Sequence, residues 1–103
     1  MRAILITPET QSIEAIQVSS RDEIPDLIGF DTIESDEVGD ADDRLYFDEE
    51  CFIRGDAVKG RFQIDSLIPI AGKGVILGST KDGAELDDAT TDIDDLKNRI
   101  KFL

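Results

Sequence analysis

Alternating and continuous runs of apolar residues divide the chain into short strands and two helices. Met1–Thr7 is a continuous apolar run of strand length, and Ser12–Ser19 alternates between apolar and polar positions. The residues between the two runs, Pro8 to Gln11, have the composition of a turn. The N-terminal segment therefore predicts a β-hairpin.

A short helix is expected over Ser19–Ile28. A capping-box spacing begins at Ser20, and Asp22 is the alternative cap. A start at Asp22 is favoured because Pro25 then falls in the first turn, where its missing N–H is not needed. Gly29 supplies a residue suited to ending the helix.

Five further strands are expected, separated by polar and glycine-containing segments. They are Phe30–Ser35, Arg44–Phe47, Cys51–Arg54, Arg61–Ile64 and Val75–Gly78. Val75–Gly78 belongs to the longest apolar stretch and predicts a buried central strand. Pro69 excludes the segment before it from a central position in a sheet, since proline cannot donate to the ladder. The turn before the central strand is Gly72 to Gly74.

The last part of the chain predicts a helix with Thr91 as its N-cap and Asp94 three residues later. Acidic residues fill its first turn and basic residues its last, which complements the helix dipole. Ile93, Leu96, Ile100 and Leu103 recur at helical spacing and form one apolar face. We expect this face to pack on the sheet. The prediction is a single α+β domain over residues 1–103, with a mainly antiparallel sheet of about five or six strands and two helices.

Charge narrows the choice of partners. Basic residues number 11 and acidic residues 24, so the formal net charge is −13. Such a surface repels phosphate, which argues against binding to nucleic acid or an anionic membrane and favours a basic protein as partner. The N-terminal apolar run is too short for a signal peptide, and the lone Cys51 cannot form an internal disulfide. A cytoplasmic location is therefore expected.

The acidic segment Asp36–Asp43 raises the question of a cation site. Asp40, Asp42 and Asp43 are the candidate ligands, since hard cations prefer clustered oxygen atoms. No window of this segment has the ligand spacing of a calcium-binding EF-hand loop, and the chain has no histidine. A solvated loop is the better interpretation. The glycines around Lys73 do not have the spacing of a phosphate-binding loop either, so no cofactor is expected.

The carboxylates nearest each other in sequence also define a candidate surface for a partner. Two acidic segments flank the predicted strand Arg44–Phe47, and they lie at its opposite ends. The candidate partner-binding residues are Asp36, Glu37, Asp40, Asp42, Asp43, Asp48, Glu49 and Glu50. The expected function is a non-enzymatic protein-binding module.

Two alternatives remain open at the sequence level. In the first, the carboxylates imitate the phosphates of a nucleic acid, as in a mimic that blocks a defence protein. In the second, paired carboxylates or a divalent metal support an enzyme, although the chain has none of the recognisable active-site patterns. An acidic stripe free of bases would favour mimicry, and a concave group of carboxylates would favour metal binding or catalysis.

Four segments carry a resemblance to a known group of proteins. They are Arg2–Glu9, Gly29–Glu34, Asp43–Glu50 and Pro69–Gly78. Their succession resembles small bacterial, phage and plasmid proteins classed under a domain of unknown function. The resemblance spans most of the chain through short strand and turn motifs. It implies an α+β fold and an origin in a mobile element, and it assigns no active-site residue.

Overall fold

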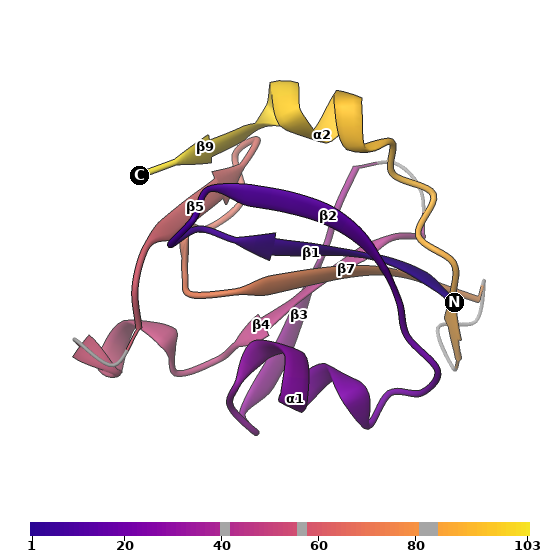
Figure 1. Cartoon of the computed structure of the whole chain (residues 1–103), viewed down its shortest axis with the longest axis horizontal. Coiled ribbons are helices and arrows are strands. Elements are labelled where there is room, and N and C mark those ends of the chain that lie inside the picture. The colour runs from indigo at the N-terminus through magenta and orange to yellow at the C-terminus, as the bar shows by residue number, and fades with distance from the viewer. Residues whose placement is uncertain (40–41, 56–57, 81–84) are drawn as a thin grey trace.

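Two antiparallel sheets and two helices make up the computed structural model, which describes residues 1–39, 42–55, 58–80 and 85–103 (Figure 1). The larger sheet has six strands: β1 (Arg2–Thr7), β2 (Ser12–Gln17), β3 (Ile33–Glu37), β4 (Arg44–Asp48), β7 (Gly74–Ser79) and β8 (Leu86–Asp87). Its order is β2-β1-β7-β4-β3, and β8 pairs with the end of β7. The smaller sheet has the order β6-β5-β9, formed by β5 (Arg61–Ile64), β6 (Ile70–Ala71) and β9 (Ile100–Phe102).

The predicted N-terminal hairpin and the predicted central strand are both confirmed. β1 and β2 pair from Arg2 opposite Gln17 to Thr7 opposite Ser12. β7 lies between β1 and β4, and its residues from Gly74 to Gly78 are all buried. A strand buried on both faces requires a continuous apolar run rather than an alternating one, which is the pattern this segment has.

The larger sheet separates two apolar clusters because successive side chains of a strand point to opposite faces. One cluster includes Ile4, Leu45 and Ile76, and the other includes Val75 and Leu77. The first cluster is covered by α2 (Ile93–Arg99) together with the smaller sheet, and the second by α1 (Glu23–Ile28). Figure 1 shows the two helices on opposite sides of the larger sheet. The predicted α+β class, with a mainly antiparallel sheet, two helices and the C-terminal helix packed on the sheet, is confirmed.

The limits of α1 follow from local chemistry. Asp22 is the N-cap, as the position of Pro25 indicated. Its side chain makes no capping hydrogen bond. The carboxylate of Glu23 instead accepts from the backbone N–H of Ser20 at 2.8 Å and from that of Ser19. Gly29 ends the helix with φ of 93°, a left-handed conformation that glycine adopts without a steric penalty.

Three predicted elements differ from the structure. Cys51–Arg54 is not a strand, because residues Cys51–Ile53 form a 3-10 helix that buries only Cys51. The strand expected at Phe30–Ser35 begins later and ends later, as β3. The N-cap of the C-terminal helix is Asp92 and not Thr91, because the carboxylate of Asp92 accepts from the N–H of Asp94. The helix ends at Arg99, and the backbone of Ile100 is extended, with φ of −95° and ψ of 143°. β9 follows and pairs with β5, so Ile100 and Phe102 reach the core from a strand.

Candidate functional site

The acidic residues expected to bind a partner lie along the hairpin formed by β3 and β4, but the structure divides them into different environments. Glu37, Asp42, Glu49 and Glu50 are exposed, and Asp36 is half-buried. Glu37 and Asp36 lie on β3, whereas Glu49 and Glu50 follow the far end of β4. Asp40 lies outside the residues that the structure describes. Asp43 and Asp48 are buried, which removes both from any exposed surface.

Asp43 stabilises the fold instead of contributing to a binding surface. Its side chain is 1% exposed and accepts hydrogen bonds from two consecutive threonines that lie far along the chain. The N–H of Thr91 donates to Oδ2 at 2.7 Å, and the N–H of Thr90 donates to Oδ1 at 3.0 Å. The hydroxyl groups of both threonines also donate to this carboxylate. Asp43 therefore fixes the segment before α2 to the β3–β4 hairpin, and its carboxylate, counted among the expected partner-binding residues, is buried instead of exposed.

Asp48 is buried in a second polar network, at the other end of β4. The Nε of Arg54 donates to its Oδ2 at 2.7 Å, and the hydroxyl of Thr32 and the N–H of Glu50 donate to Oδ1. Burial by itself raises the pKa of the Asp48 carboxyl, but the hydrogen bonds from Arg54, Thr32 and Glu50 outweigh it, and the pKa lies below its ordinary value. The guanidinium of Arg54 also lies 3.9 Å from the ring centre of Phe30. Asp48, which was also expected to bind a partner, is thus a buried residue of this network and not part of the exposed surface.

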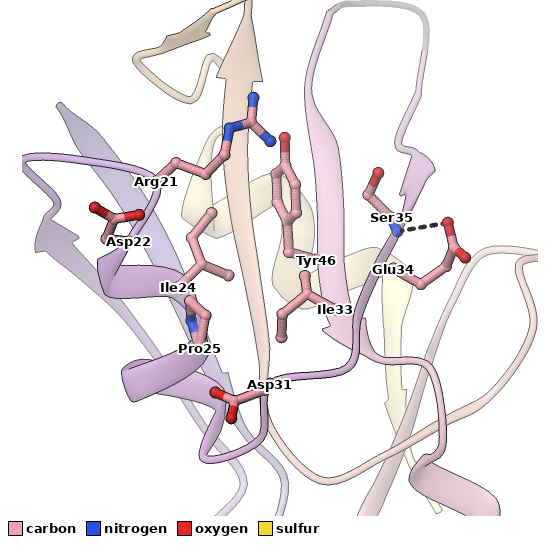
Figure 2. Close-up of a pocket in the computed structure, with 9 residues that line it drawn as sticks. All are labelled: Arg21, Asp22, Ile24, Pro25, Asp31, Ile33, Glu34, Ser35 and Tyr46. Carbon is pink, nitrogen blue, oxygen red and sulfur yellow. Dashed lines mark hydrogen bonds between the residues drawn. The ribbon is translucent and has the colours of Figure 1, made fainter.

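A groove of about 390 Å³ lies between α1 and the β3–β4 hairpin. Figure 2 shows its lining, in which Ile24 and Pro25 of α1 face Ile33 and Tyr46 of the hairpin. These four side chains form an apolar floor. Polar residues form the rim, and we call the whole hollow the acidic groove. The rim residues are Arg21, Asp22, Asp31, Glu34 and Ser35.

Charge on the rim of the acidic groove is unevenly distributed. Three of the rim residues are exposed carboxylates, namely Asp22, Asp31 and Glu34. Arg21 is the single base, and its guanidinium lies beside the hydroxyl of Tyr46 in Figure 2. Within the described part of the chain, Arg21 forms no ion pair, whereas Arg54 pairs with the buried Asp48. The rim therefore has an excess of negative charge above an apolar floor.

A second, shallower hollow of about 530 Å³ adjoins the acidic groove and shares Pro25 and Asp31 with it. Asp26 and Glu50 add two more carboxylates to its edge. Glu50 is thus a member of the expected surface that lines a hollow adjoining the groove, where it pairs with Arg54 at 3.6 Å. Asp26, Asp31 and Glu50 outnumber this one base, so carboxylates remain in excess along this side of α1.

The sequence did not indicate the groove or its rim. Asp22 and Asp26 stand four residues apart on a short helix, which places both on one side of it. That spacing was the available signal. Nothing local, however, indicates that this side of α1 faces the strand that carries Glu34, because the contact depends on how the helix packs over the sheet.

Other candidate features are absent from the described residues. Among residues 1–39, 42–55, 58–80 and 85–103, no group of three or more acidic or cysteine side chains is arranged to hold a metal ion. The same residues contain no helix that is both long enough and apolar enough to cross a membrane. Cys51 is buried, as expected for a small apolar residue rather than a nucleophile.

Comparison with known proteins adds no identification. No protein-family model matches the chain, and neither a curated protein nor a solved structure shows significant similarity to it. The functional argument therefore depends on the geometry and charge of the site described above.

Proposed function

We propose that this chain is a protein-binding module that holds a basic segment of a partner in the acidic groove. The observation that carries the proposal is the combination of an apolar floor with a rim rich in carboxylates. Lysine and arginine have the matching chemistry, because a long apolar stem ends in a cationic group. The stem would contact Ile24 and Ile33, and the charged end would lie near Asp31 and Glu34.

The distribution of bases favours this function over imitation of a nucleic acid. Mimicry needs a continuous array of carboxylates, and here arginines interrupt it. Arg44 pairs with Glu37 at 3.8 Å, and Arg54 pairs with the buried Asp48. The β3–β4 hairpin therefore presents separate carboxylates and not a continuous array, which suits single cationic side chains.

Tyr46 offers a direct measurement of binding, since it is the only tyrosine and the chain has no tryptophan. Its ring forms part of the groove floor, so its fluorescence reports on occupancy. The probe is a short peptide of alternating lysine and glycine, and its matched partner carries acetyl-lysine in place of lysine. We expect a saturable fluorescence change with the lysine peptide that weakens as ionic strength rises. The acetylated peptide should give none.

Matched variants separate the groove from general charge. Changing Asp31→Asn and Glu34→Gln together should raise the dissociation constant at least about tenfold. Changing Glu9→Gln and Glu85→Gln alters the net charge equally at exposed sites outside the groove, and should change the constant less than about twofold. Removing the competing base by Arg21→Gln should strengthen binding. Equal weakening by both double variants, or equal binding of the acetylated peptide, would contradict the proposal.

A further inference from the structure

The larger sheet ends in two edge strands, β2 on one side and β3 on the other. An edge strand has unpaired N–H and C=O groups that can pair with another strand, and proteins usually block them with charges, prolines or bulges. The acidic groove lies beside β3. The two edges differ in how well they are blocked, and this difference is independent of the proposed function.

The β3 edge is closed by its own side chains. Backbone pairing with β4 makes Glu34 and Asp36 face inward, so Ser35 is the central residue whose backbone faces outward. Its N–H donates to the carboxylate of Glu34 at 3.3 Å. Its C=O accepts from the Nη2 of Arg44 at 3.3 Å. Another strand would have to displace both groups.

The β2 edge has no such protection. The N–H of Val18 donates to the C=O of Met1 at 2.9 Å, and the amino group of Met1 donates to the C=O of Val18 at 2.8 Å. Every second residue of β2, counted back from Val18, therefore has its backbone groups directed at β1. The backbone groups of Ile13, Ala15 and Gln17 consequently point away from β1. Within the described residues, no hydrogen bond reaches these outward groups.

The side chains of β2 also leave this edge accessible. Between Ser12 and Val18 the only charged residue is Glu14, although 34% of the whole chain is charged. The strand contains neither proline nor glycine, and Ala15 at its centre is small and exposed. α2 packs beside β2 on the face that carries Ile13, but no strand of the described residues pairs along the outer edge of β2.

We propose that β2 pairs antiparallel with β2 of a second copy of this chain, around a twofold axis at Ala15. In this register Ala15 faces its own copy, and Ile13 faces Gln17. Glu14 then faces Ile16 of the other copy, so the two glutamates are not directly opposed. The two larger sheets become one continuous sheet.

The choice of a second copy follows from the unequal edges. A twofold pairing uses the same strand from each copy and leaves only the two β3 edges at the ends of the joined sheet. Because a further strand would have to displace Glu34 and Arg44 at these edges, we expect assembly to stop at a dimer. The net charge of −13 on each copy opposes association, so the dimer should be favoured by salt.

Sedimentation equilibrium and amide exchange test this inference on the full chain. The dimer dissociation constant should fall at least about tenfold as sodium chloride rises from about 0.05 M to about 1 M. Salt should thus strengthen dimerisation but weaken binding of the lysine peptide, so one experiment can contradict either proposal without contradicting the other. The amides of Ile13, Ala15 and Gln17 should become protected as protein concentration rises, whereas that of Ser35 should not.

Variants at the axis give the decisive comparison. Ala15→Pro removes an outward N–H and leaves the ladder with β1 intact, which an edge strand tolerates. Ala15→Lys places two like charges opposite each other across the axis. It replaces the proline variant in this test if that variant does not fold. Both should be monomeric, and Ala15→Thr should still dimerise. A chain that stays monomeric at high salt, a dimer that persists in the folded Ala15 variants, or protection confined to other strands would overturn the inference.

Discussion

Replacing Asp43 with alanine should cost about 2–4 kcal/mol of unfolding free energy. Hydrogen bonds to a charged group contribute about 1.5–3 kcal/mol each, and Asp43 accepts several from Thr90 and Thr91. The sum is reduced because Thr90 is exposed and its N–H regains water in the variant. A loss of this size is a large part of the roughly 5–15 kcal/mol that stabilises a typical domain.

Urea unfolding measures this loss, and the neighbouring residue supplies the control. Asp42 is exposed, and its backbone carbonyl, rather than its side chain, accepts from Ser79. Asp42→Ala should therefore change stability by less than about 0.5 kcal/mol. Asp43→Asn should fall between the two, since an amide nitrogen cannot accept the bonds that a carboxylate oxygen does. An Asp43→Ala variant no less stable than Asp42→Ala would refute the argument that this carboxylate holds the segment before α2 in place.

Two further predictions concern the core and the dependence on acid. Leu96→Ala should lower the free energy of unfolding by about 2–5 kcal/mol, measured by heat or urea, because Leu96 is fully buried. Leu103→Ala should lower it by less than about 0.5 kcal/mol because Leu103 is 60% exposed. Equal effects of the two changes would contradict the packing of α2. Because the pKa of Asp48 lies below its ordinary value of 3.8, its ionised form stabilises the fold above that pH, and this contribution is lost as the pH falls toward the lowered pKa. Asp48→Asn should flatten this decline in an acid series of urea titrations, and an unchanged slope would show that the network does not act as described.

Periodicity was a good guide wherever one side of an element faces the core. The alternating Ser12–Ser19 segment and the continuous apolar run at Val75–Gly78 both became strands in the expected places. Cys51–Arg54 was misassigned because Cys51, Phe52 and Ile53 form a short apolar run, which is typical of a buried strand. In the structure they form one turn of 3-10 helix in which only Cys51 is buried, and three residues are too few to distinguish the two.

The C-terminal segment shows how tertiary pairing overrides a local pattern. Ile100 stands four residues after Leu96, which fits a helix, yet its backbone is extended and pairs opposite Ile64. The added strand brings Phe102 opposite Phe62, a contact that the helical pattern does not contain. A pattern within one segment has no information about a partner strand that lies so far away in the sequence.

The candidate site was predictable only in its chemistry. An excess of carboxylates and an expected role in binding a basic protein can be read from composition. Burial cannot, and Asp42 and Asp43 illustrate this, because adjacent identical residues have opposite environments. Asp43 is buried only because Thr90 and Thr91 return to the hairpin from far along the chain.

The position of β7 in the larger sheet has a consequence for how the chain acquires its structure. The hairpin β1–β2 and the hairpin β3–β4 each form from residues close in sequence, but they have no pairing with each other. β7 is inserted between them, and it begins at Gly74, well after β4 ends at Asp48. Sheets that depend on distant pairings fold slowly because the chain must close a long loop first. During synthesis the two hairpins therefore remain separate until β7 has been made.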